Sequence, residues 1–353
     1  QRKEHVMANI KLKKPLLSTA ILACLFGGAL TTIGSMTGGV NDLVNSAKSK
    51  VKLTKKEESF SDLSSLNTNL AARNLVINES PDDKAHLTYY QSDGNYQIDG
   101  SSLGKITTSS ENGNLNIKEE GAGSFHISAG IRSLLSLFDQ ESQGKRTVQL
   151  SLPKGTKLET FSGSSSLGDV TLSNLSAKNA DFSLSNGSLT VNDSQFASGK
   201  FKNSLGEISF NNSQISSGKI NASSGNIGLN NSHFETGEIT AALGNINLNS
   251  SKISDTSFKI SSGSISSKKL DFVGNISITN QLGDINLQLV PNSLNKLSFD
   301  LKTALGDIDI PNGINVEYTK DSKLTGSTLV HKIENPTATL TITAKSGNIK
   351  LNE

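Results

Sequence analysis

The chain has 353 residues, of which 34% are hydrophobic and none is Trp, whereas ordinary globular domains are about 45–50% apolar. Its net charge is only +2, from 34 basic and 32 acidic residues, which excludes a strong field for nucleic acid. Cys24 is the single cysteine, which excludes a disulfide framework and a cysteine-based metal site.

The N-terminal segment predicts a membrane anchor. Residues 15–36 supply about 20 predominantly apolar residues, long enough to cross a bilayer as one helix. Residues 1–14 form a basic leader, so the positive-inside rule predicts that they are cytoplasmic and that the rest of the chain is extracellular. Five lysines between residues 48 and 56 follow the span and oppose this orientation.

Two alternatives share this segment. Small residues after the apolar run, Gly34 and Ser35, allow a cleaved signal peptide and a secreted product. The sequence ILAC, residues 21–24, resembles a lipobox, which would make the chain a lipoprotein modified at Cys24.

A linker and a first β region follow the apolar segment. Residues 37–68 are polar and rich in Lys and Ser, and they predict a stalk or linker. Residues 69–167 show alternating apolar positions and predict an N-terminal β region. Residues 129–144 interrupt the alternation, and they predict a short helix or an apolar loop that packs on the sheet.

Tyrosines gather around a predicted hairpin. The dipeptide Asp93-Gly94 is a tight-turn signal between alternating segments that carry Tyr89 and Tyr96. Together with Tyr90, these two tyrosines form an aromatic group that is suited to stacking on a sugar or a protein partner. The alternative is that they pack within the sheet.

From residue 168 onward the chain is periodic. The pattern Gly-x-(Val/Leu/Ile) recurs every 19 residues and finally after 20, at Gly168, Gly187, Gly206, Gly225, Gly244, Gly263 and Gly283. Looser repeats follow at Gly306 and Gly347. A unit this small cannot bury its apolar residues alone, but coils stacked about 4.8 Å apart can share one core. Residues 168–353 therefore predict an all-β fold, a β-solenoid with about 19-residue coils and a C-terminal cap.

Apolar columns define the predicted interior. Residues two and four places after each glycine are apolar with strand spacing. Two further columns lie nine and fourteen places after glycine: Ala177, Phe196, Ile215, Phe234, Ile253 and Phe272, and then Phe182, Phe201, Ile220, Ile239 and Phe258. These columns predict three short strands in each coil, separated by turns.

Polar columns accompany them. Asn192, Asn211, Asn230 and Asn249 align, as do Ser194, Ser213, Ser232 and Ser251. We expect the asparagine amides to form a hydrogen-bonded ladder and the small serines to occupy corners. The glycines that start the coils, and the mid-repeat Gly199, Gly218 and Gly237, predict turns with positive φ.

The serial GDV, GEI, GNI and GDI strands, the segment TVQLSLPKG and the terminal SGNIKL resemble the bacterial putative-adhesin family of β-strand-repeat domains. The resemblance covers roughly residues 60–353. It implies an envelope-associated and often membrane-anchored protein, in some cases linked to envelope-stress operons. No catalytic residues carry over, because the family has none established.

Catalysis is the rival interpretation. A glycan-active enzyme needs several acids or bases close together on one face. The column after the coil glycines carries Asp169, Glu207 and Asp284, but never in adjacent coils, and no His or Arg column supports them. The histidines show no joint metal-ligand spacing: His86, His126, His233 and His331. The sequence therefore predicts no catalytic, metal or cofactor site.

A charged column follows the mid-repeat glycines and consists of Lys200, Lys219 and Glu238. These residues either pair across coils and support the register or belong to a binding face. With Tyr89, Tyr90 and Tyr96 they form the predicted interaction surface.

Together these patterns predict a non-enzymatic interaction module at the cell surface or envelope, held in the membrane by residues 15–36. Its partner is an unidentified protein or glycan of the surface or envelope, and not nucleic acid. One alternative is an envelope-stress accessory protein that modulates a membrane partner, and another is a glycan-active β-helix enzyme. Three segments that break the repeat are further candidates for function: the hairpin tyrosines, residues 129–144 and residues 288–297.

Overall fold

The computed structural model describes residues 53–92, 96–98, 101–121, 144–322 and 326–353. These residues form an all-β structure. The described ranges contain two short helical segments, the 3-10 helix Leu294–Lys296 and one helical turn at residues 144–146 directly before β9. No helix within these ranges has the length and hydrophobicity needed to cross a bilayer. The anchor predicted at 15–36, with its signal-peptide and lipoprotein alternatives, lies outside the described residues.

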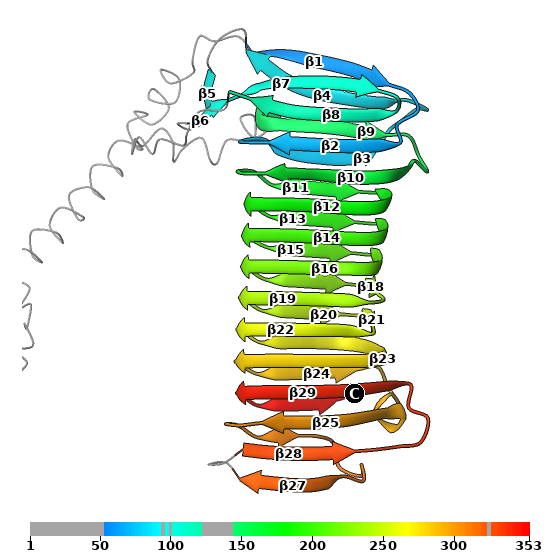
Figure 1. Cartoon of the computed structure of the whole chain (residues 1–353), viewed down its shortest axis with the longest axis vertical. Coiled ribbons are helices and arrows are strands. Elements are labelled where there is room, and N and C mark those ends of the chain that lie inside the picture. The colour runs from blue at the N-terminus through cyan, green and yellow to red at the C-terminus, as the bar shows by residue number, and fades with distance from the viewer. Residues whose placement is uncertain (1–52, 93–95, 99–100, 122–143, 323–325) are drawn as a thin grey trace, which may run out of the picture.

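Two long sheets face each other across one core, and each coil contributes to both (Figure 1). Sheet A carries the strand that begins two residues after the coil glycine. Its strands stack in this order: β1 (Leu53–Phe60), β4 (Ala85–Ser92), β9 (Thr147–Leu152), β3 (Asn74–Glu79), β11 (Val170–Ser173), β13 (Leu189–Asn192), β15 (Ile208–Asn211), β17 (Ile227–Asn230), β20 (Ile246–Asn249), the first part of β23 (Ile265–Leu282), β24 (Ile285–Leu289), β30 (Ile349–Asn352) and β26 (Ile308–Asp309).

Sheet B carries the longer return strands. It stacks β7 (Lys105–Glu111), β8 (Asn114–Glu120), β2 (Ser65–Leu70), β10 (Lys157–Ser165), β12 (Ser176–Asn186), β14 (Gln195–Leu205), β16 (Gln214–Ser224), β18 (His233–Phe234) with β19 (Gly237–Leu243), β21 (Lys252–Ser254) with β22 (Thr256–Ser262), the second part of β23, β29 (Ala338–Ser346), β25 (Leu297–Thr303), β28 (Gly326–His331) and β27 (Glu317–Ser322). A separate pair, β5 (Tyr96–Ile98) and β6 (Ser101–Leu103), is antiparallel.

The solenoid prediction is therefore right in architecture and wrong in one detail. Most coils have two strands, because the nine-place and fourteen-place columns lie on one continuous strand, as Phe196 and Phe201 do on β14. The main chain keeps its pairing with the neighbouring coil through the bend, from Gln195 to Leu205. Only the coils that contain β18 and β21 divide this strand in two.

Two segments, one near each end of the described chain, are threaded one coil inside the stack. Strands β2 and β3 lie between β8/β9 and β10/β11. At the other end β29 and β30 lie between β23/β24 and β25/β26, so the C-terminus is inside the stack (Figure 1). Antiparallel strands close both ends: β1, β4 and β7 on one side, β28 and β27 on the other. Such strands cover parallel edges that would otherwise template aggregation.

Two predictions for the N-terminal part are corrected. Residues 53–68, assigned to the linker, contain β1 and the start of β2. The strand that carries Tyr89 does not form a hairpin with the one that carries Tyr96. Instead β4 pairs with β1 and β9, because β1 offers eight residues in register, and β5 pairs with β6. The predicted turn at Asp93-Gly94 and most of 129–144 lie outside the described residues.

The core is one continuous column of apolar side chains between the sheets. Phe161 and Phe182 stack with ring centroids 5.4 Å apart, and the ring of Phe201 meets those of Phe196 and Phe210 edge to face at 5.1 Å. Such aromatic pairs add to the free energy gained by burying apolar area. A low apolar content therefore suffices, because nearly every apolar residue of the repeat points inward.

Corner glycines set the distance between coils. Gly225 has a φ of 144°, and a Cβ built on it would lie 2.0 Å from the carbonyl oxygen of Gly206. Positive φ was also predicted for the mid-repeat glycines. It is found at Gly237 but not at Gly199 or Gly218. Gly218 is needed for another reason, because its Cβ would lie 2.0 Å from the oxygen of Gly199.

The predicted ladders are confirmed. Asn211 donates its side-chain amide to Asn192 Oδ1 at 2.9 Å, and Asn230 donates in the same way to Asn211 at 3.0 Å. At the corner, Ser213 Oγ accepts the backbone N–H of Ser194 at 3.1 Å. The residue between the two ladders has positive φ in successive coils, as at Asn212 and Asn231, and the sequence analysis did not anticipate this.

We expect Gly225→Ala to lower the free energy of unfolding by at least about 2 kcal/mol, since it combines an unfavourable φ with a main-chain clash. Gly228→Ala in the same coil is the matched control. Its Cβ meets nothing closer than 3.6 Å, so its stability should change by less than about 1 kcal/mol. Urea unfolding of both variants measures the difference. Equal stability would contradict the role of the corner glycine.

Candidate functional site

The predicted charged column lies on the outer face of sheet B. Lys200 on β14, Lys219 on β16 and Glu238 on β19 occupy the same register position in successive coils. Asp181 on β12 precedes them and pairs with Lys200 at 3.5 Å. Lys219 lies 4.0 Å from Glu238, so the column includes the cross-coil pairing that the sequence suggested.

Two more lysines lie in the adjoining column, which reads Lys202, Asn221, Thr240 and Lys259 in successive coils. Lys259 on β22 lies 2.5 Å from Glu238, and its hydrogen bond holds the pKa of that carboxyl below its usual value. Lys202 on β14 is exposed two residues after Lys200. The lysine face, defined as Lys200, Lys202, Lys219 and Lys259 with Asp181 and Glu238, thus has four cations and two carboxylates. Solvent-exposed pairs contribute about 0–1 kcal/mol, so a partner can compete for these lysines.

The predicted tyrosine group is not brought together on the surface. Tyr89 is only 6% exposed, so it cannot stack on a partner, and its hydroxyl donates to Glu58 Oε1 at 2.7 Å. Burial and this hydrogen bond both raise the pKa of the Tyr89 phenol. Tyr90 is partly exposed on the same strand, and the side chain of Tyr96 lies outside the described residues. Tyr89 therefore packs within the sheet, which was the alternative interpretation, and its hydroxyl is held by Glu58 of β1, a strand that had been predicted to be linker.

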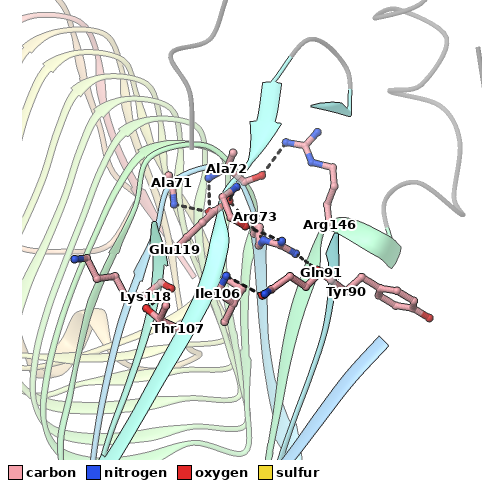
Figure 2. Close-up of polar contacts among 11 residues, drawn as sticks. Ala71, Ala72, Arg73, Tyr90, Gln91, Ile106, Thr107, Lys118, Glu119 and Arg146 are labelled. Atoms are coloured by element: carbon pink, nitrogen blue, oxygen red, sulfur yellow. Dashed lines mark hydrogen bonds and ion pairs between the residues drawn. The ribbon is translucent and has the colours of Figure 1, made fainter. Parts of the chain in front are cut away.

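A buried ion pair fixes the N-terminal coil (Figure 2). Arg73 is 1% exposed, and its Nε lies 3.5 Å from Glu119 Oε1. The Arg73 guanidinium also donates to the carbonyl oxygens of Tyr90 and Gly104, at 2.9 and 3.0 Å. Burial lowers the pKa of Arg73, and the Glu119 carboxylate opposes that shift.

The Glu119 carboxylate accepts two backbone hydrogen bonds that main-chain carbonyls of a neighbouring coil accept elsewhere in the stack. Its Oε2 accepts the backbone N–H groups of Ala71 and Ala72, each at 2.8 Å (Figure 2). In the next coil the matching amides, of Ser166 and Leu167, bond to the main-chain carbonyls of the neighbouring coil. The strand β8 ends at Glu120, so a carboxylate replaces these carbonyls where the repeat is interrupted.

This pair was not predicted from the sequence, although the sequence carries a signal for it. Arg73 is in phase with the inward-facing Leu75 and Ile77, and Glu119 is in phase with Leu115 and Ile117. Two opposite charges at inward positions of two alternating segments indicate a buried pair. The pair bonds to the main chain of Ala71 and Ala72, of Tyr90 and of Gly104, so it holds these segments of the coil together.

A shallow groove of about 350 Å³ runs along the corner after the sheet A strands. Its lining is polar and comes from stacked coils: Gln195, Asn212, Ser213, Gln214, Asn231, Ser232, His233, Ser250 and Lys252. Within it Gln214 donates to Glu235 Oε1 at 2.7 Å. The groove offers amides at the coil spacing but no aromatic platform.

Side chains in the column after the coil glycines accept hydrogen bonds from the main chain of the neighbouring coil. Asp169 Oδ1 accepts the backbone N–H of Ser188 at 2.8 Å, and Asn226 Oδ1 accepts that of Asn245 at 2.9 Å. Ser188 stands between Asp169 and Glu207, so the two carboxylates do not form a dyad across adjacent coils. Among the described residues, no three His, Cys, Asp or Glu side chains gather as metal ligands; His126 lies outside them.

Comparisons with known proteins add the following. A family model described as Toastrack DUF4097 matches residues 63–352. No curated protein matches the chain. Two solved structures show low similarity. A putative adhesin from Bacteroides fragilis is 13% identical, with 86% of this chain and 98% of that chain covered and a TM-score of 0.39. A putative cell adhesion protein from Clostridium sporogenes is 12% identical, with 85% and 99% covered and a TM-score of 0.23. Similarity at this level carries no argument about function.

We expect Glu119→Ala to lower the free energy of unfolding by about 3–5 kcal/mol, because it leaves the Arg73 charge buried without its partner. Asp181→Ala removes a carboxylate from an exposed pair and should cost less than about 1 kcal/mol. Urea unfolding measured on both variants distinguishes the two cases. A loss for Glu119→Ala no larger than for Asp181→Ala would refute the corner-replacement role.

Proposed function

Because the chain belongs to the Toastrack DUF4097 family, whose model matches residues 63–352, we propose that it is a non-enzymatic interaction module displayed at the bacterial surface. The match agrees with the resemblance drawn from the repeat over residues 60–353. In this proposal residues 15–36 anchor the chain in the membrane and the solenoid projects outward to meet its partner.

The lysine face carries this proposal. Its strands, β12, β14, β16, β19 and β22, are hydrogen-bonded neighbours in one sheet, so the charged groups sit on a fixed grid with strands about 4.8 Å apart. Lys200 and Lys219 are 66% and 67% exposed and are held only by weak surface pairs. A fixed array of cations with few carboxylates favours an extended, repeating anionic partner.

An acidic glycan is the partner class that we propose. Its charges repeat along a chain, so several of them can contact lysines on different strands of the sheet at once, and binding through charge needs no aromatic platform. Phosphate-rich or carboxylate-rich glycans both supply such charges. Binding of this kind weakens as salt screens the charges.

The test uses bacteria that display the full chain and beads coated with polygalacturonate. We expect wild-type cells to bind at low salt, and Lys200→Ser/Lys202→Ser to weaken binding roughly fivefold, from about 0.5 kcal/mol per exposed charge. Lys268→Ser/Lys350→Ser removes two exposed lysines from sheet A and is the control. It should leave binding unchanged.

Two results would contradict the proposal. Equal loss in both double variants would show that net charge, and not the lysine face, governs adhesion. Absence of salt-sensitive binding by wild-type cells would remove the acidic glycan as partner class.

A further inference from the structure

Exposed leucines line one edge of the solenoid. The residue just before each corner glycine forms a column that we call the leucine edge, and it reads, in stacking order, Leu167, Asn186, Leu205, Ser224, Leu243, Ser262, Leu282, Ser346 and Leu305. Leu205, Leu243, Leu282 and Leu305 are 51%, 57%, 56% and 55% exposed, the largest exposures of large aliphatic side chains among the described residues, whereas Leu167 is only partly exposed. Leucine thus alternates strictly with a small polar residue.

The alternation of leucine with a small polar residue continues across neighbouring strands that are not consecutive in the sequence. Leu282 is followed in space by Ser346, which comes from the threaded C-terminal strand β29, and then by Leu305, which follows β25. The backbone N–H of Gly283 donates to the Ser346 carbonyl at 3.0 Å, and that of Gly347 donates to the Leu305 carbonyl at 2.8 Å. The pattern therefore belongs to the assembled surface and not to the local repeat.

Within the described residues, these leucine side chains remain about half exposed. Leucines in alternate coils stand about 9.6 Å apart, twice the strand spacing, which is too far for one to cover the next. We propose that the leucine edge is the contact surface of an antiparallel homodimer. In it each leucine packs opposite a small polar residue of the second copy.

The eight positions from Asn186 to Leu305 are complementary to themselves, and Leu167 lies beyond this paired stretch. A two-fold axis placed between Leu243 and Ser262 sets Leu243 opposite Ser262, and Ser224 opposite Leu282, in the two copies. The outer positions follow, so that Leu205 meets Ser346 and Asn186 meets Leu305. A second copy has the same coil spacing, so the match holds over all eight positions from Asn186 to Leu305. A partner helix with leucines every seven residues repeats at about 10.5 Å instead of about 9.6 Å, so its leucines lose alignment with those of the edge.

The charged residues that flank the leucine edge, one place after the corner glycines, are compatible with this arrangement. The residue after each corner glycine is acidic at Asp169, which lies beyond the paired stretch, and within that stretch at Glu207, Asp284 and Asp307. In the antiparallel register these face Asn348, Asn226 and Ser188, so no carboxylate meets another. The other flank is small, with Ser or Ala at six of eight positions: Ser185, Ser204, Ser223, Ala242, Ser261 and Ala304.

The area is in the range of a specific interface. Four half-exposed leucines present on the order of 400 Å² of apolar surface per copy, and a standard interface buries about 800 Å² per partner. The small polar positions and flanks supply the rest. This geometry places the β1 ends of the two copies at opposite ends, so if the proposed anchor holds, the pair joins chains from two facing surfaces.

The test is disulfide trapping in the full chain, solubilised in detergent and carrying Cys24→Ser. In Asn186→Cys/Leu305→Cys the two thiols are seven coils apart in one chain, roughly 34 Å, and meet only between antiparallel copies. We expect a dimer on non-reducing electrophoresis. Asn186→Cys/Lys350→Cys carries its second thiol on sheet A and should stay monomeric, as should Leu305→Cys alone.

Light scattering provides the second measurement. Wild type should have the mass of a dimer after subtraction of the micelle, and Leu243→Ser/Leu282→Ser should raise the dimer dissociation constant at least about 100-fold while urea unfolding of the monomer is unchanged. A monomeric wild type, or a dimer trapped equally by Leu305→Cys alone, would overturn the proposal. Neither readout depends on glycan binding, so this failure is separable from failure of the lysine face.

Discussion

The approach of one corner glycine to the next is the constraint on which the rest of the structure depends. A Cβ on Gly206 would lie 2.1 Å from the oxygen of Gly187, and one on Gly347 would lie 2.0 Å from that of Gly283. Each corner is also tied by a hydrogen bond from the glycine N–H to the neighbouring coil, as from Gly206 to Ser224 at 2.9 Å. A slip of one residue would move every inward side chain outward, so these corners fix the register of the whole stack.

Because the register is fixed, residues at the same position of successive repeats lie in a line along the surface of the stack. The asparagine ladder, the lysine face and the leucine edge arise from the same stacking and differ only in the position within the coil. Polar side chains on the inner turns satisfy main-chain groups, as Ser213 does for Ser194. The lysines and the leucines, in contrast, leave much of their surface to solvent, and for this reason we assign interaction to them.

The repeating columns of the solenoid could be predicted from the sequence, whereas the strands that interrupt the repeat could not. Columns such as Phe196 and Ile215 could be read from their spacing alone, because each coil imposes the same environment. The threading of β29 and β30 could not, since their apolar pattern fits any neighbouring coil. Strand β1 was missed because Leu53–Phe60 is an edge strand whose exposed charges hide the alternation. The leucine edge was overlooked because its period is two coils and its last members are not sequential.

The most direct test of this account is hydrogen exchange of the backbone amides in the full chain. If corner stacking locks every coil and the C-terminal coil is held between two others, amides of β29 and β30 exchange as slowly as those of β16 and β17 in the centre. A C-terminal strand that merely caps the stack frays first, as free ends of chains do. Rapid exchange in β29 and β30, with protection confined to the central coils, would contradict the threaded, register-locked solenoid.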